Sequence, residues 1–188
     1  MGRPAVGLWL PEKHEALDAA PWLEHFCDLE ARSDGSIDVC VRNPSAVGLP
    51  YLQQAEGRFN LGPEVIDDGE QAAFPGLDTP PAAELVVFAY CSGPQEHRLL
   101  GHLALFLAER FGALIDFGGM LGYRYAGHCR TVEEKAARLA ESRALVALLP
   151  GRVLEMPFEI EDGLYGYSHV GDREFLAAWL GHPDFRLI

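Results

Sequence analysis

The sequence predicts a single α+β domain over residues 1–188, with a mixed sheet of about five or six strands and helices mostly on one face. Short apolar or alternating runs typical of strands are interspersed with longer runs whose apolar residues recur at helical spacing. The chain has 188 residues, of which 48% are apolar and 23% charged. This size and composition are those of one soluble domain that can bury a core without disulfides.

The N-terminal part combines strand and helix signals. Residues 5–10, Ala-Val-Gly-Leu-Trp-Leu, predict a short buried strand that stops at Pro11. From 12 to 29 the apolar residues follow helical spacing, and Pro21 within this run predicts a kink or two short helices. Residues 37–41 alternate between apolar and polar side chains, as in a half-buried strand.

The centre of the chain carries the clearest pattern, a strand followed by a helix and a second strand. Residues 84–91 are almost wholly apolar, which is typical of a central strand covered on both faces. An apolar stripe predicts a helix over 95–111, and Gly112 is placed to cap its C-terminus. Residues 113–117 return as a strand, so the three segments predict a β-α-β unit.

The C-terminal part predicts two helices around a hairpin. Thr131 opens a capping-box pattern, and the helix that it starts runs to about Leu149. Two strands, at 153–160 and 164–170, are separated by a turn signal and predict a hairpin. A last short helix is predicted over 173–180.

One segment, residues 43–83, is irregular and acidic. The stretch 56–84 holds seven acids and one base, and the stretch 12–34 holds seven acids and two bases, whereas 109–147 is nearly neutral. The whole chain has 28 acidic and 15 basic residues, a net charge of −13. If the two acidic stretches lie together in the fold, they form one negative patch.

This charge argues against a chain that binds nucleic acid or an anionic membrane through its own field. An acidic patch instead attracts a basic protein partner, although an acidic excess also serves solubility alone. The apolar run at residues 103–107, like every other apolar run of the chain, is far shorter than a membrane span of about 20 residues. The first residues lack the apolar core of a secretory signal, so we expect a cytoplasmic protein.

Motifs for catalysis, cofactors and metals are weak, and we expect no cofactor and no metal. The chain lacks the glycine-rich phosphate loops and the nucleophile elbow of hydrolases. The tripeptide Asp116-Phe117-Gly118 matches a kinase magnesium motif, but the rest of the kinase set is missing. His97 and His102 are separated on the predicted helix by about 140° and do not share a face. A metal site assembled from scattered histidines stays open as a minor alternative.

Cys91 supports an alternative, catalytic interpretation. It lies at the end of a predicted strand and before a helix N-terminus, a position that lowers the pKa of a thiol. With His97, His102 or His128 as a base, Cys91 would make a small cysteine-dependent enzyme. The competing interpretation is a buried, inert thiol.

Three stretches resemble a bacterial family of unknown function, the domain of unknown function numbered 6368. They are Pro4-Ala5-Val6-Gly7-Leu8-Trp9-Leu10-Pro11, the stretch from Leu103 to Gly119 and the stretch from Trp179 to Leu187. The resemblance implies no catalytic residues. In size, acidity and central helix-strand pattern the chain is also loosely similar to bacterial immunity proteins, which bind and neutralise a cognate toxin.

We therefore expect a non-catalytic cytoplasmic binding protein, an immunity protein that neutralises a cognate bacterial toxin with a basic surface. The alternatives are the Cys91-dependent enzyme and an interaction domain with no toxin partner. The candidate partner-binding residues are the carboxylates Glu64, Asp67, Asp68, Glu70 and Asp78.

Overall fold

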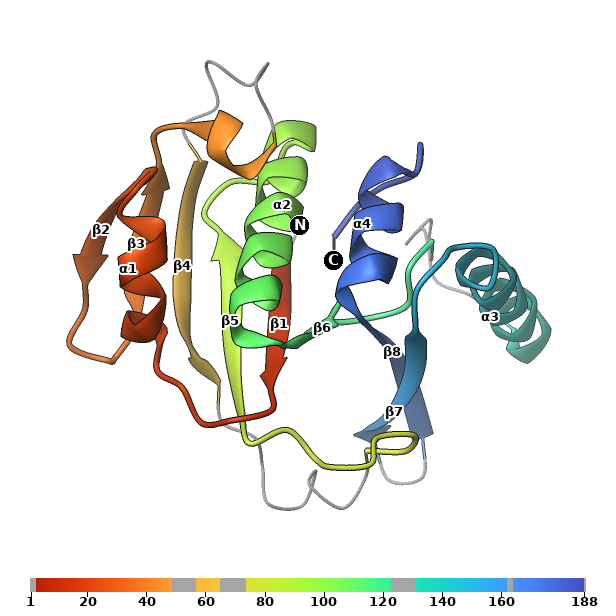
Figure 1. The fold of residues 1–188 in the computed structure, drawn as a ribbon. Coiled ribbons are helices and arrows are strands. Elements are labelled where there is room, and N and C mark those ends of the chain that lie inside the picture. The colour runs from red at the N-terminus through yellow and green to blue at the C-terminus, as the bar shows by residue number, and fades with distance from the viewer. Residues whose placement is uncertain (1–2, 49–56, 65–73, 123–130, 162–163, 188) are drawn as a thin grey trace.

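The computed structural model describes residues 3–48, 57–64, 74–122, 131–161 and 164–187. These residues form one eight-stranded sheet with four α-helices (Figure 1). The strands are β1 (Ala5–Leu10), β2 (Cys27–Ala31), β3 (Ile37–Val41), β4 (Gly57–Glu64), β5 (Ala83–Ala89), β6 (Leu114–Asp116), β7 (Val153–Glu161) and β8 (Leu164–Gly171). The helices are α1 (Ala20–Leu23), α2 (Pro94–Phe111), α3 (Val132–Val146) and α4 (Arg173–Gly181), with 3-10 turns η1 (Ala16–Ala19) and η2 (Pro44–Val47).

The α+β class is confirmed, but the expected mixed sheet of five or six strands is wrong. The order across the sheet is β2-β3-β4-β5-β1-β6-β8-β7, and every pairing among the described strands is antiparallel. The predicted β-α-β unit exists, since α2 joins β5 to β6. These two strands do not pair, however, because β1 lies between them and is antiparallel to both.

Two strands, β2 and β4, were not predicted from the sequence. β2 occupies the end of a run with helical spacing, and β4 lies in the segment that looks irregular. The glycines of β4 resemble loop signals, yet they serve close packing. A Cβ on Gly57 would collide with the Leu99 side chain of α2, and one on Gly62 would lie 2.9 Å from the Ser36 Cβ in the turn between β2 and β3.

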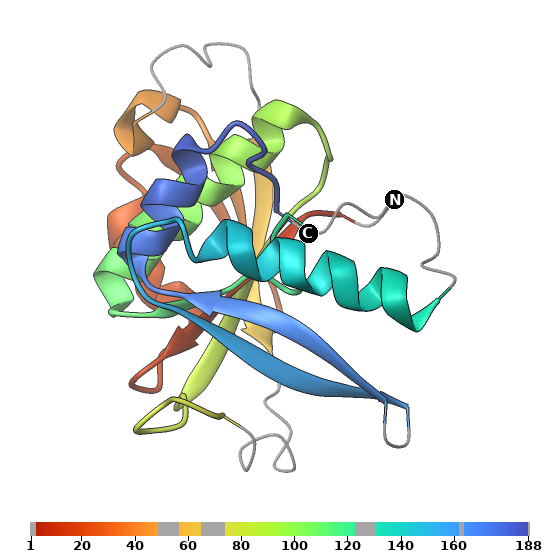
Figure 2. The ribbon, with the colours of Figure 1, turned by 90° about the vertical axis from the view of Figure 1, so that its right-hand side faces the viewer.

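One side of the sheet is covered by helices and carries the core. Figure 2 shows α1, α2 and α4 on the same side of the strands β1 to β5. The side chains that point to this side are fully buried, including Leu8, Leu61, Val87 and Ile115. α2 meets them with its leucine stripe, so the strongest predicted helix forms the centre of the core.

We call the opposite side of β1, β3, β4, β5 and β6 the open face. Because side chains alternate along a strand, this face carries the residues between the core positions. It is made of Ala5, Gly7, Asp38, Cys40, Arg58, Asn60, Gly62, Glu64, Glu84, Val86, Phe88 and Asp116, with Tyr90 just beyond β5. Trp9 is on the same side but is covered by a second, smaller cluster with Phe74 and Met156.

Candidate functional site

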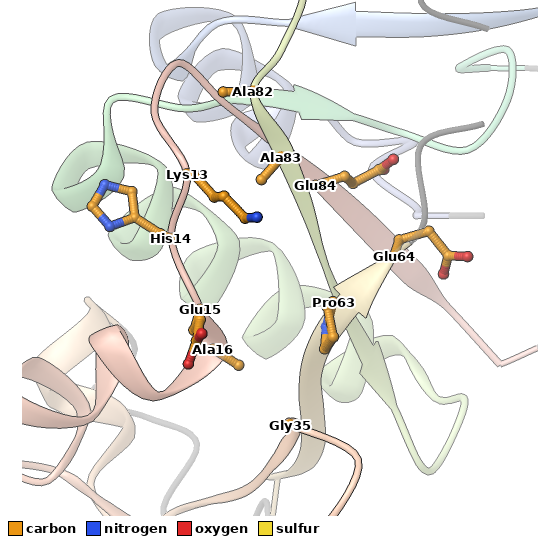
Figure 3. A pocket seen from close by; sticks show the side chains of 10 residues that line it. All are labelled: Lys13, His14, Glu15, Ala16, Gly35, Pro63, Glu64, Ala82, Ala83 and Glu84. Atoms are coloured by element: carbon orange, nitrogen blue, oxygen red, sulfur yellow. The ribbon is translucent and has the colours of Figure 1, made fainter. Parts of the chain in front are cut away.

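Two glutamates face each other at one end of the open face. In the register of β4 and β5, Glu64 is directly opposite Glu84. Figure 3 shows both side chains extending from the ends of these neighbouring strands. Like charges in this position destabilise a sheet by roughly 0.2–1 kcal/mol. Within the described part of the chain Glu64 forms no hydrogen bond or ion pair, whereas Glu84 has an interaction of its own.

The carboxylates continue across the sheet toward β6. A Cβ on Gly7 would collide with Oε1 of Glu84, so the glycine gives this side chain room to lie over β1. Asp116 pairs with Gly7 from the other side. Its Oδ1 accepts hydrogen bonds from Ser168 Oγ and, at 2.8 Å, from Gly118 N. Carboxylates from three strands therefore lie on the open face, Glu64 and Glu84 at its end and Asp116 level with Val86.

A pocket of about 460 Å³ opens beside the two glutamates (Figure 3). It brings Glu15, from the acidic stretch 12–34, together with Glu64 and Glu84 from the stretch 56–84. Lys13 adds a cation to the lining. The two acidic stretches thus adjoin at this pocket, although Figure 3 shows the Glu64 and Glu84 side chains extending away from Glu15.

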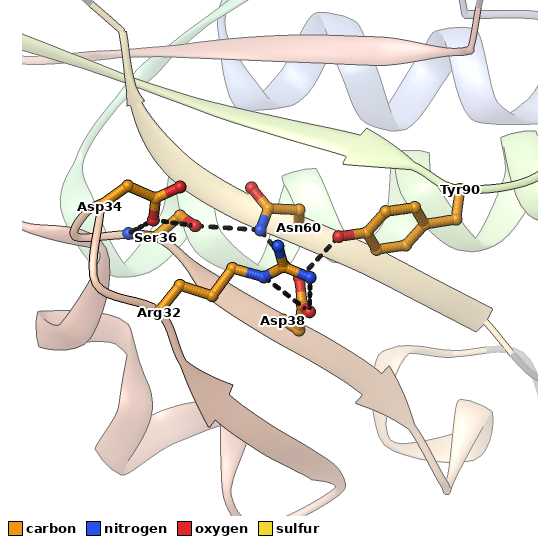
Figure 4. Close-up of polar contacts among 6 residues, drawn as sticks. All are labelled: Arg32, Asp34, Ser36, Asp38, Asn60 and Tyr90. Carbon is orange, nitrogen blue, oxygen red and sulfur yellow. Dashed lines mark hydrogen bonds and ion pairs between the residues drawn. The ribbon is translucent and has the colours of Figure 1, made fainter.

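The other end of the open face holds a polar cluster centred on Asp38 (Figure 4). Arg32 Nε donates to Asp38 Oδ2 at 2.8 Å. Asn60 Nδ2 and the Tyr90 hydroxyl donate to Asp38 Oδ1 at 2.9 and 2.7 Å. Burial opposes the charge of Asp38, but these hydrogen bonds outweigh it and lower the pKa of the carboxyl. The bond to Asp38 also raises the pKa of Tyr90, which stays a hydrogen-bond donor.

The cluster extends to the turn before β3. Asn60 Nδ2 also donates to Ser36 Oγ at 3.1 Å, and Ser36 Oγ donates to Asp34 Oδ1 at 2.7 Å. Asn60 is only 6% exposed, so its amide depends on these partners. The cluster therefore fixes the surface of β3, β4 and β5 without any further molecule.

Cations and aromatic rings surround this cluster. The Arg3 guanidinium lies 5.5 Å from the centroid of the Tyr90 ring, and Tyr90 meets Phe88 edge to face at 5.3 Å. Arg58 is exposed on β4 beside Tyr90, whose backbone N–H donates to the Arg58 carbonyl. The open face is thus positive near Tyr90 and negative near Glu84, with half-buried Val86 between the two ends.

The predicted site residues have different outcomes. Glu64 ends β4 and is exposed on the open face, and Asp78 is exposed in the connection that leads to β5. Asp67, Asp68 and Glu70 lie outside the described residues. Sequence reasoning did not select Glu84, because residues 84–91 look like a strand covered on both faces. That expectation is wrong, since the open face leaves Glu84, Val86 and Phe88 half-buried.

The described histidines do not assemble around Cys91. Cys91 is exposed, whereas His97 is 6% exposed and its Nδ1 accepts a hydrogen bond from Leu187 N. His102 faces the turn at Gly48, and His128 lies outside the described residues. Within the described ranges no three histidine, cysteine or acidic side chains are grouped as metal ligands.

The fold and the site define a class of protein, an α+β domain with one helix-covered sheet face and one polar, charged face. The chain belongs to the family of unknown function DUF6368, whose model matches residues 1–188. No curated protein and no solved structure matches it. In the part of the chain that the structure describes, no helix is long and apolar enough to cross a membrane.

Proposed function

We propose that this protein is a non-catalytic cytoplasmic binding protein, an immunity protein that neutralises a cognate bacterial toxin through its acidic surface. The toxin has a basic surface, and neither nucleic acid nor a membrane is a partner. The carboxylates of the stretch 56–84 meet the arginines and lysines of the toxin. The candidates are Glu64 and Asp78, which are exposed in the structure, and Asp67, Asp68 and Glu70, which lie outside the described residues.

The observation that carries the proposal is the pairing of Glu64 with Glu84. Two carboxylates directly opposite each other weaken the folded protein, and a hydrophobic or oppositely charged pair would be more stable there. A cationic side chain of a partner, placed between them, relieves this repulsion. The repulsion between Glu64 and Glu84 destabilises the free protein, and its relief on binding adds to the affinity of the complex.

The positive end of the open face supports the same proposal. Arg58 is exposed and forms no ion pair within the described residues. A partner that lies along the strands would meet carboxylates at one end and Arg58 with Tyr90 at the other. Opposite charges at the two ends fix the direction in which the partner docks, which favours specificity.

The test is binding to the product of the toxin gene adjacent to the gene for this protein. We expect a 1:1 complex by calorimetry, with an association rate that falls as salt rises. Glu64→Gln should weaken the affinity at least about tenfold, which corresponds to about 1.4 kcal/mol. Glu174→Gln is the matched control, because Glu174 is exposed in α4 on the helix-covered side and the change in net charge is identical.

Three outcomes would contradict the proposal. The absence of any complex with the wild-type protein would remove the toxin as partner and leave an interaction domain of another kind. Association that is insensitive to salt, or equal effects of Glu64→Gln and Glu174→Gln, would remove the acidic end of the open face from the interface.

A further inference from the structure

The end of the chain folds back onto α2 and α4. We call residues 182–187 the C-terminal strap. In the view of Figure 1 the strap is seen between α2 and α4, and its backbone forms hydrogen bonds to side chains of both helices. Leu187, at the end of the strap, is 2% exposed and belongs to the main core cluster. The strap therefore completes the core over the N-terminal half of α2.

Several side chains of α2 and α4 hold the strap in place. Trp179 Nε1 donates to the Arg186 carbonyl at 3.2 Å, which ties the strap to α4. Arg98 of α2 donates to the Leu180 carbonyl, and its guanidinium lies 5.8 Å from the centroid of the Phe185 ring. A Cβ on Gly101 would lie 2.8 Å from the Phe185 ring, so the glycine makes room for this ring on α2.

His97 makes the polar contact between α2 and the far end of the strap. Its Nδ1 accepts a hydrogen bond from Leu187 N at 3.2 Å, which places the ring proton of the neutral side chain on Nε2. Nε2 is buried and has no hydrogen-bond partner within the described residues. The closed strap is therefore compatible with the neutral ring. A second proton would be on Nδ1, where the strap offers an N–H donor and no acceptor.

We propose that the C-terminal strap is a pH-dependent latch, which opens from α2 when His97 takes up a proton. A protonated ring carries a hydrogen on both nitrogens, so the Nδ1 hydrogen would point at the Leu187 N–H. The bond is then lost and two donors face each other. Release of the strap exposes His97 to water. It also removes Leu187 from the core and Phe185 from its contact with Gly101 of α2.

The charged groups around His97 favour the neutral ring. Arg186 of the strap opposes a further positive charge on the ring, while Glu96 of α2 favours one. Arg98 follows His97 on α2 and is directed at the Phe185 ring and the Leu180 carbonyl. The remaining titratable groups of the strap are Asp184 and His182, and His182 is stacked on Trp179 of α4. Burial lowers the pKa of His97 below its ordinary 6.5, Arg186 lowers it further, and Glu96 opposes both.

The direction of the pH effect follows from this shift. With the strap open, the ring is solvated and titrates near pH 6.5. With the strap closed, its pKa is lower, so closure is fully favourable above pH 6.5 and weakens as the pH falls below this value. The closing equilibrium constant decreases by up to tenfold for each pH unit, until the pKa of the closed state is reached.

Hydrogen exchange of the intact protein at pH 7.5 and 5.0, corrected for the intrinsic exchange rate, tests the latch. In the wild type we expect opening of the peptide that covers the strap to increase by up to roughly thirtyfold, while β1 and β5 stay protected. His97→Asn should remove this increase, because its amide oxygen replaces Nδ1 as acceptor and does not titrate. His182→Asn is the control, since His182 Nδ1 also accepts a backbone bond in the strap, from Asp184 N at 3.1 Å.

Equal protection of the strap at the two pH values, or an increase that persists in His97→Asn, would overturn the proposal. Simultaneous opening of the strap and β5 would also overturn it, because the effect would then be global unfolding. An NMR titration of the wild type gives a readout that does not depend on the variants. A His97 pKa of 6.5 or higher in the closed protein would exclude the latch.

Discussion

Acidification should destabilise this protein through His169, a buried histidine of β8 that bonds to the turn following β6. His169 is 2% exposed, and its Nδ1 accepts a hydrogen bond from Leu121 N at 3.0 Å. Its backbone also bonds to Phe117 and Gly119 on the same turn. Burial lowers the pKa of His169 from 6.5 to about 4, with a small opposing effect from Glu155 and a small supporting one from Arg143.

The sign and size of the effect follow from this shift. Because the pKa is lower in the folded state, the unfolded state takes up the proton first as the pH falls. The stabilisation is fully present above pH 6.5 and is lost between pH 6.5 and about 4. A shift of this size corresponds to about 3 kcal/mol, of which about 2 kcal/mol is lost by pH 5. That is a large fraction of the typical 5–15 kcal/mol stability of a domain.

Urea unfolding at pH 7.0, 6.0 and 5.0 measures this loss. His97 and His102 are also buried histidines with lowered pKa values, so the wild-type loss contains their contributions. The difference between the wild type and His169→Asn isolates His169, since asparagine keeps an acceptor near the Nδ1 position and does not titrate. The exposed His25, replaced by Asn, is the control. If His169→Asn loses as much stability as the wild type between pH 7 and 5, the reasoning is wrong.

Three further predictions concern the sheet and the thiols. Glu64→Gln should raise the free energy of unfolding by about 0.2–1 kcal/mol in urea, because it removes the repulsion with Glu84; a loss of stability would contradict this. Gly57→Ala should lower it by about 1–3 kcal/mol, because the added Cβ collides with a leucine of α2, and an unchanged midpoint would show that α2 adjusts. Cys91 is exposed and should react with a thiol reagent in the native protein, whereas buried Cys27, whose pKa burial raises to about 12, should react only on unfolding.

Local signals in the sequence were reliable where short-range bonds decide the structure. Gly112 adopts the left-handed conformation at the end of α2, with φ of 65°. At the start of α3 the Thr131 hydroxyl accepts a hydrogen bond from Glu134 N. The Glu134 carboxylate accepts one from Thr131 N, which completes the capping box. Asp172 caps α4 through Phe175 N at 2.8 Å. Each of these features depends on residues no more than four positions apart.

The predicted number of strands was too low because two strands, β2 and β4, form only through contacts with residues distant in the sequence. The residues of β4 have a strand conformation because β3 and β5 pair with both of its edges. Its glycines and Pro63 have low strand propensity on their own, and tertiary packing overrides that propensity. The same holds for β2, whose five residues become a strand only through their pairing with β3.

The candidate site shows the same division. Composition and charge along the chain determined that carboxylates concentrate in two stretches, and the apolar run at 84–91 determined that this segment is a strand. Only the antiparallel register of β4 and β5 placed Glu64 opposite Glu84, and only the insertion of β1 between β5 and β6 placed Gly7 and Asp116 beside them. Strand pairing joins residues that are far apart in the chain, and its register depends on the packing of the whole core rather than on local sequence.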